Sequence, residues 1–112
     1  MRIFLIPALL AAALAVGCAS SPKGETYSGE YFYNFEWASF FPDGNKDERW
    51  CVEGDMGRAE LPATDPSGPW GTSHVVVRGT LGPPGSYGNL GACKRILNVI
   101  ELIEISNMRG KE

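Results

Sequence analysis

The chain has 112 residues, of which 44% are hydrophobic, 11% aromatic and 21% charged, and its formal net charge is −3. That length suits one small domain, and that composition is typical of a globular chain rather than a disordered one. The acidic balance argues against a nucleic-acid partner, and the single histidine excludes a multi-histidine metal site.

The first predicted element is a signal peptide over residues 1–17. Arg2 precedes an apolar run of 14 residues, Ile3 to Val16. A helix that spans a bilayer needs about 20 residues, so this run is too short to cross. Its length and its place behind a basic residue are typical of a secretory signal. A buried core helix is the alternative interpretation.

The run ends in Leu14–Cys18 (LAVGC), which resembles the lipobox of bacterial lipoproteins. The resemblance implies that the signal is removed before Cys18, that this cysteine carries acyl chains, and that they anchor the protein in a membrane. Because Ala19 follows where an aspartate would retain the protein at the inner membrane, we expect an outer-membrane anchor facing the periplasm of the bacterial envelope. The inner membrane and the cell surface remain alternatives.

A short polar tether and one domain follow the anchor. We predict a flexible tether over residues 18–28, a β domain over 29–107 and a C-terminal tail over 108–112. Within the domain, Cys51 and Cys93 remain as a pair once Cys18 is lipidated. An even pair in an oxidising compartment predicts one disulfide, although two free thiols are the alternative.

The domain is predicted to be all-β. Alternating or β-branched residues mark four strands, and the last of them also fits a helical stripe, but its isoleucine and valine content favours a strand. The four segments are Tyr31–Trp37, Arg49–Glu53, His74–Leu81 and Arg95–Ser106.

The connections carry their own signals. Pro42–Asn45 is a strong turn, and a long link over 54–72 is expected to hold one helical turn near Ala59–Leu61. Gly79 lies within a strand pattern and predicts a bulge or bend, and a change of phase near Ile100 predicts another bulge.

Glycines recur at every third position from Gly79 to Gly91. Four triplets are too few for a collagen helix, and no Gly-Lys-Ser/Thr follows to bind a phosphate. We therefore expect a turn-rich connection between two strands. Whether this block is a binding loop or a barrel corner stays open at this point.

Several of these segments together resemble a group of small bacterial lipoproteins and exported proteins of unassigned function. The resemblance implies an OB-fold-like barrel of four to five strands. The chain departs from that group's pattern at Cys51 and Asn89, where an aromatic residue and a histidine are usual. The matching segments are Phe35–Pro42, Arg49–Trp50, Val75–Leu81 and Gly85–Gly91.

Three sets of residues could carry chemistry, and each has a simpler interpretation. His74 could act as the base for a nucleophilic Ser73 or Ser86. Ser73 and His74 are neighbours on a strand, however, and such neighbours point to opposite faces. Glu101 and Glu104 could pair as a general acid and base, but a solvated face is the simpler interpretation. An acidic loop looks faintly like a calcium site without its spacing; its residues are Asp43, Asn45, Asp47 and Glu48. We therefore predict no catalytic residue, no metal and no cofactor.

The function expected from these features is that of a non-enzymatic, lipid-anchored binding or structural module for an envelope protein or glycan. An inhibitor of a hydrolase such as lysozyme is the alternative. Aromatic residues on an open barrel face can stack against ligands. The predicted binding patch is Tyr31, Tyr33, Trp70, Arg78 and Tyr87.

Overall fold

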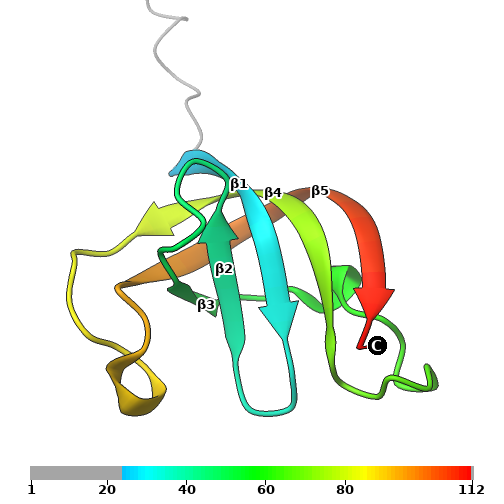
Figure 1. The fold of residues 1–112 in the computed structure, drawn as a ribbon. Coiled ribbons are helices and arrows are strands. Elements are labelled where there is room, and N and C mark those ends of the chain that lie inside the picture. Colours follow the sequence, from blue (N-terminus) through cyan, green and yellow to red (C-terminus); the bar gives the residue numbers. More distant parts are fainter. Residues whose placement is uncertain (1–23, 112) are drawn as a thin grey trace, which may run out of the picture.

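Five strands close into a ring, and a computed structural model describes them within residues 24–111. Their order around the ring is β1-β2-β3-β5-β4 (Figure 1). Neighbouring strands are antiparallel except β3 and β5, which run parallel. The expectation of an all-β, OB-like barrel is confirmed. The strands are β1 (Glu25–Tyr33), β2 (Ala38–Pro42), β3 (Trp50–Glu53), β4 (Gly71–Leu81) and β5 (Arg95–Gly110).

No helix in this part of the chain is both long enough and apolar enough to cross a membrane.

The first predicted strand is wrong at its end, because a tight turn divides it after Tyr33. The side-chain oxygen of Asn34 accepts hydrogen bonds from the N–H groups of Glu36 and Trp37, at 2.8 and 2.9 Å. The N–H of Asn34 in turn donates to the carbonyl of Trp37 at 3.0 Å. An asparagine that bonds its own backbone in this way favours a turn over a continued strand. Residues 34–37 therefore connect β1 to β2.

The domain is longer at both ends than its sequence suggests. Residues 25–28, predicted as tether, belong to β1, and residues 108–110, predicted as tail, belong to β5. Tyr27 explains the first correction, because it pairs with Val77 and meets the ring of Trp50 edge-on at 5.6 Å. Gly110 pairs with Gly71 across the sheet and so extends β5. The rest of the predicted tether, residues 18–23, and the signal peptide lie outside the described residues.

The core lies inside the ring and is built by alternation along the strands. In β4 the side chains of Val75 and Val77 are fully buried while their neighbours face outward. Phe40 of β2 stacks on Trp50 of β3 with ring centroids 5.4 Å apart. Burial of such rings on one face of each strand provides most of the driving force for closing the barrel.

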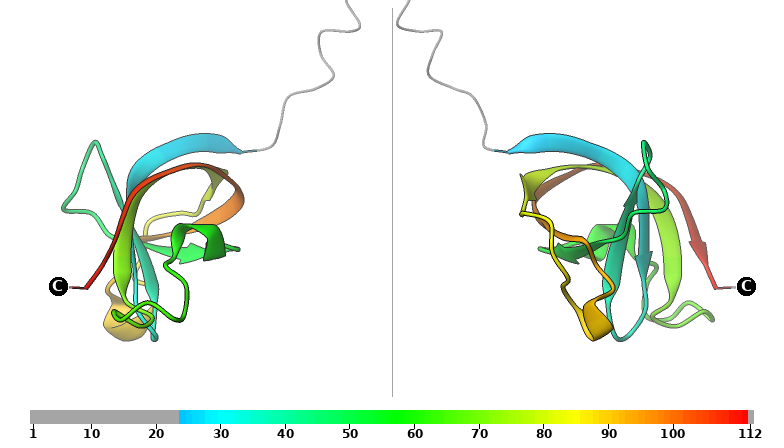
Figure 2. Two further views of the ribbon diagram at one scale, coloured as in Figure 1. Left: turned by 90° about the vertical axis from the view of Figure 1, so that its right-hand side faces the viewer. Right: turned by 60° about the vertical axis from the view of Figure 1, so that its left-hand side comes forward.

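The link between β3 and β4 covers the core through the short 3-10 helix η1 (Gly57–Ala59), close to the predicted helical turn. Figure 2 shows η1 on the inner side of the curved sheet, where Ala59 is fully buried. Tyr31 donates its hydroxyl proton to Glu60 at 2.6 Å, and the hydroxyl oxygen of Tyr33 accepts from the N–H of Leu61 at 2.9 Å. Two core tyrosines thus fasten this link to β1.

Bulges in β5 account for the predicted change of phase. Gly79 pairs with Val99 and Arg78 with Glu101, so Ile100 is the extra residue between them. Such an insertion bends the strand, as barrel closure requires. It also turns the side chain of Ile100 outward, where it is exposed. The bulges predicted at Gly79 and near Ile100 are confirmed and coincide.

Candidate functional site

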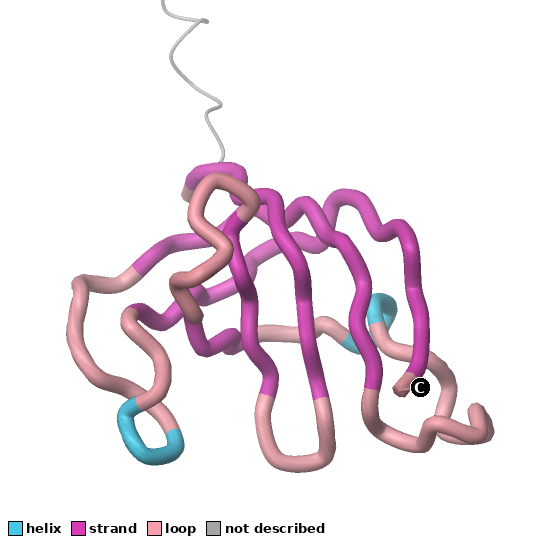
Figure 3. Tube along the Cα trace, in the orientation of Figure 1, coloured by secondary structure: helices cyan, strands magenta, loops and turns pink. Residues whose placement is uncertain are grey.

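The glycine-rich block between β4 and β5 is a folded loop. Gly85 donates its N–H to the carbonyl of Lys94 at 2.9 Å. Tyr87 and Cys93 exchange two backbone hydrogen bonds, at 2.9 and 3.0 Å. The short 3-10 helix η2 (Asn89–Gly91) lies at the tip of the loop (Figure 3). We call residues 82–94 the β4–β5 loop.

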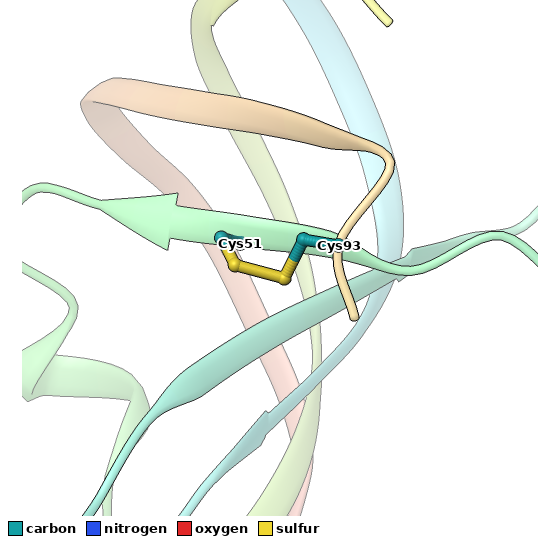
Figure 4. Close-up of a disulfide and its surroundings, with 2 residues drawn as sticks. All are labelled: Cys51 and Cys93. Carbon is teal, nitrogen blue, oxygen red and sulfur yellow. A yellow bond between two sulfur atoms is a disulfide. The ribbon is translucent and has the colours of Figure 1, made fainter. Parts of the chain in front are cut away.

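A disulfide fastens this loop to the barrel. Cys51 of β3 and Cys93 are bonded, with Cα atoms 5.4 Å apart, so the predicted pairing is confirmed (Figure 4). Gly88 sits against the bridge, since a Cβ at this position would come within 2.7 Å of the Cys51 sulfur. Its φ of 74° is also one that glycine adopts without strain. The loop therefore holds a fixed position over β3.

A pocket of about 410 Å³ opens between the 34–37 turn and the β4–β5 loop, over the faces of β2 and β3. Both connections project from the same side of the barrel (Figure 3). Ligand pockets commonly measure about 300–1,000 Å³, and OB-fold barrels bind ligands at this place. The lining residues whose side chains can recognise a ligand are Glu36, Trp37, Ser39, Arg49 and Asn89.

Arg49 is the cation of the pocket. Its guanidinium carbon lies 5.9 Å from the ring centroid of Trp37 and 5.2 Å from that of Phe41. Within residues 24–111 the guanidinium makes no hydrogen bond and no ion pair. Aromatic contacts therefore hold this group in place while its N–H groups stay unused.

Trp37 contributes a second unused donor. Its indole N–H is buried and, among the described residues, has no acceptor. A buried polar group without a partner costs about 1–3 kcal/mol, so most such groups are satisfied. Because this N–H is covered, a ligand oxygen would satisfy it only after a small movement of the Trp37 side chain.

Apolar side chains stand beside the pocket on both connections. Phe35, next to Glu36 in the turn, is 73% exposed, and Leu90, next to Asn89 in the loop, is fully exposed. Leu90 also has φ 57° and ψ 21°, a left-handed conformation that a leucine seldom adopts. Exposed apolar groups and strained backbone are both enriched at binding sites.

The predicted binding patch does not assemble. Tyr31 and Tyr33 are only 1% and 3% exposed and belong to the core, which corrects their assignment to a surface. Trp70 directly precedes the start of β4 and packs against Phe32, with ring centroids 6.1 Å apart. The two remaining residues engage other partners: Arg78 bonds Glu101 at 3.2 Å, and Tyr87 donates its hydroxyl proton to the carbonyl of Pro83 at 2.9 Å.

His74 belongs to a polar cluster on the outside of the barrel. Its Nε2 lies 2.9 Å from Oδ2 of Asp43, and Ser28 donates to the same oxygen at 2.7 Å. A nucleophilic triad needs the histidine to bond its acid and its hydroxyl through different nitrogens. Here Nε2 faces both, with the hydroxyl of Ser28 3.5 Å away. The hydrogen bonds from Ser28 and His74 lower the pKa of Asp43 below its ordinary value.

The other residues considered for chemistry also have structural surroundings. Ser73 is buried and donates to the carbonyl of Ala59 at 3.2 Å, so it does not face His74. Glu101 pairs with Arg78. Among the residues that the structure describes, no three acidic, cysteine or histidine side chains converge on a position where they could hold a metal ion.

Sequence reasoning missed the pocket because its residues come from three separated segments, 36–39, 49–51 and 88–93. Trp37 and Arg49 are 12 positions apart and meet only when β2 pairs with β3. The Gly85–Gly91 motif was the useful signal, since it forms one wall. The fold and the pocket define a small OB-like barrel with a ligand-sized cavity on its β2–β3 face. No protein-family model, curated protein or solved structure matches the chain.

Proposed function

We propose that this protein is a non-enzymatic binding module of the bacterial envelope, lipid-anchored through Cys18, that holds its ligand in the pocket between the 34–37 turn and the β4–β5 loop. The pocket itself carries the proposal. It combines a ligand-sized volume with an unused cation at Arg49, and beside them the buried indole N–H of Trp37 has no acceptor among the described residues. Binding sites place a few such polar groups within an otherwise apolar cavity.

The rigidity of the pocket supports binding rather than a purely structural role. The disulfide between Cys51 and Cys93 and the backbone bonds of the β4–β5 loop fix one wall. Asn34 fixes the opposite wall through its turn. A preformed site loses less conformational entropy when a ligand binds, and this raises affinity.

The envelope location rests on the sequence that precedes the barrel. Cys18 lies outside the described residues, and its proposed lipidation follows from the apolar run and the LAVGC segment. Two or more acyl chains would hold the protein stably at a membrane. We therefore look for the ligand among envelope proteins and glycans, on the periplasmic side of the outer membrane.

Photo-crosslinking in intact cells tests the proposed function. A photoreactive residue replaces Leu90 beside the pocket or, as a matched control, Ile103, which is exposed on β5 and does not line the pocket. We expect discrete adducts from position 90 and none of the same mass from position 103. Equal adducts at both positions, or none at 90, would contradict binding at the pocket. Mass spectrometry of the adduct then identifies it as protein or glycan.

An enzyme assay tests the alternative role as an inhibitor of a hydrolase. Purified full-length protein is incubated with lysozymes, and their turnover of cell walls is measured. If the protein lowers lysozyme turnover and a substitution at Leu90 restores it, the protein is an inhibitor of a hydrolase and our proposal is wrong. Unchanged turnover is the result we expect.

A further inference from the structure

We infer that the pocket receives a carboxylate group carried by an apolar peptide, presented either by the chain end or by an acidic side chain. This inference rests on the proposed function, since it names the chemistry of the ligand at the same site. It starts from the two unused donors, Arg49 and Trp37, which line one cavity.

The position of Arg49 suits a carboxylate in particular. A guanidinium is planar, and its N–H groups point outward in that plane, where they match the two oxygens of a carboxylate. Its contacts with the rings of Trp37 and Phe41 limit its movement without using those N–H groups. A ligand carboxylate can thus form charge-assisted hydrogen bonds with a group that is already positioned.

Arg49 differs from the other arginines of the described chain in having no polar partner. Arg58 and Arg95 donate to backbone carbonyl groups, and Arg78 and Arg109 bond glutamates. Those four are engaged within the barrel. The unpaired guanidinium of Arg49 is therefore a feature of the pocket and not of the surface as a whole.

The indole of Trp37 adds a donor that only accepting groups can satisfy. A carboxylate has two oxygens, both acceptors when it is ionised, so one ligand group can accept hydrogen bonds from both Arg49 and Trp37. Because the indole N–H is covered, its engagement requires a small movement of the Trp37 side chain. That movement makes the indole signal of Trp37 a direct reporter of binding.

The apolar neighbours favour a peptide over a glycan. Phe35 and Leu90 offer exposed apolar side chains on either connection. Leu90 is aliphatic and suits apolar peptide side chains, whereas a sugar held inside the pocket would need an open aromatic face there. One face of the Trp37 ring already carries the guanidinium of Arg49 and is closed to stacking.

Glu36 is the acidic residue among those that line the pocket. Its carboxylate makes no ion pair within the described residues and would repel an anionic ligand. Glu36 and Arg49 are therefore expected to affect affinity in opposite directions. This opposition provides a matched pair of variants.

The test uses the full-length protein in detergent and two pairs of blocked peptides. N-acetyl-Leu-Phe is compared with its C-terminal amide, and N-acetyl-Leu-Asp-amide with N-acetyl-Leu-Asn-amide. Binding is followed by calorimetry and by the indole N–H resonance of Trp37. We expect at least one acid to bind about tenfold or more tightly than its matched amide and to shift that resonance. The pair that responds identifies the source of the carboxylate.

The variants separate charge from folding. Arg49→Gln is expected to weaken the acid about tenfold or more, and Arg49→Lys to weaken it less because charge remains without the planar fork. Glu36→Gln is expected to strengthen it about two- to fivefold. Melting curves establish that each variant is folded, and Arg49→Lys serves if Arg49→Gln does not fold.

Three results would overturn the inference. Equal affinity for acids and amides would leave a binding pocket without carboxylate recognition. Tighter binding of N-acetylmuramic acid than of either peptide acid would assign the pocket to a glycan. Absence of binding by all four peptides would also reject the inference, while the photo-crosslinking at Leu90 tests the pocket independently.

Discussion

The glycines of the β4–β5 loop are required for different physical reasons, and this difference can be measured. Gly88 combines a φ of 74° with a neighbouring sulfur that a Cβ would approach to 2.7 Å. At Gly85 a Cβ would meet the far end of the Tyr87 ring at 2.9 Å, and that ring can shift at the cost of only its exposed hydrogen bond to Pro83. We expect Gly88→Ala to reduce the free energy of unfolding by more than about 1 kcal/mol and Gly85→Ala by less. Denaturant unfolding of both variants measures the difference.

Gly79→Val is the corresponding change inside the barrel. A Cβ at this position would collide with the backbone carbonyl of Asn98 in the neighbouring strand, and backbone cannot rotate away. We expect the largest loss of the three variants. A Gly79→Val protein that unfolds like the unchanged protein would contradict the close packing at this bulge.

Asp43 should make stability depend on pH in the acid range. Hydrogen bonds from Ser28 and His74 stabilise the charged carboxylate, so its pKa is lower in the folded protein than the ordinary 3.8, and Lys46 acts in the same direction. A group with a depressed folded pKa stabilises the fold above its unfolded pKa, and this contribution disappears as the pH falls through the folded pKa. We expect Ser28→Ala to lower the melting temperature at neutral pH, and the difference to shrink well below pH 3.8.

A matched control for this prediction is Ser86→Ala, since Ser86 lies in the β4–β5 loop, away from Asp43 in sequence and fold. Its melting temperature should follow that of the unchanged protein at every pH. A Ser28→Ala deficit that stays constant in acid would show that the hydrogen bond to Asp43 does not depend on the carboxylate charge.

At the scale of the elements, the disulfide links the stability of the barrel to the shape of the pocket. It closes a segment whose ends are 42 residues apart, for which chain entropy gives a stabilisation of about 4 kcal/mol. The double variant Cys51→Ala/Cys93→Ala should therefore lose about 2–5 kcal/mol of unfolding free energy. Thermal melts and denaturant titrations measure that loss.

The same variant should lose ligand binding even at temperatures where it is still folded. Cys51 and Cys93 both line the pocket, and their bond holds the β4–β5 loop over β3. Crosslinking through a photoreactive residue at Leu90 would then decrease. Undiminished crosslinking in the folded double variant would mean that the loop keeps its position without the bridge.

Local patterns predicted the elements well where one face of a strand is buried. The alternation in β4 places Val75 and Val77 on one face, which is the buried face in the structure, and the loss of phase in β5 located the bulge at Ile100. The end of β1 was missed because the aromatic alternation continues through Phe35 and Trp37 although Asn34 turns the chain. There a side-chain hydrogen bond outweighs strand propensity.

The pairing of distant strands could not be predicted from such patterns. The parallel contact of β3 with β5 joins Trp50 to Arg95, and no local periodicity specifies it. The pocket depends on that closure, so its residues could not be grouped from sequence either. The tyrosines show the opposite difficulty, since Tyr31 and Tyr33 look suited to ligand binding yet use their hydroxyl groups to fasten the link after β3.

At the scale of the whole molecule, the direction of β1 relates the membrane to the pocket. The strand starts at Glu25 and ends at Tyr33, directly before the 34–37 turn that lines the pocket. Nine residues of strand extend about 30 Å, so the start of the domain and the pocket lie at opposite ends of the barrel (Figure 1). If Cys18 carries the proposed lipid, we expect the start of β1 to lie nearer the bilayer than the pocket does.

The last prediction tests the anchor and this orientation together. Cys18→Ser should abolish labelling by a palmitate analogue and leave an uncleaved precursor, because the acylated sulfur is lost. In the lipidated protein, a fluorescent amino acid at Thr26, near the start of β1, should be quenched by a quencher attached to lipid more strongly than one at Leu90. The contrast should vanish when the Cys18→Ser protein is mixed with the same vesicles, since it has no acyl chain to orient it. Equal quenching at Thr26 and Leu90 in the lipidated protein would mean that the barrel lies along the membrane, and the pocket would then have to receive its ligand from the bilayer surface.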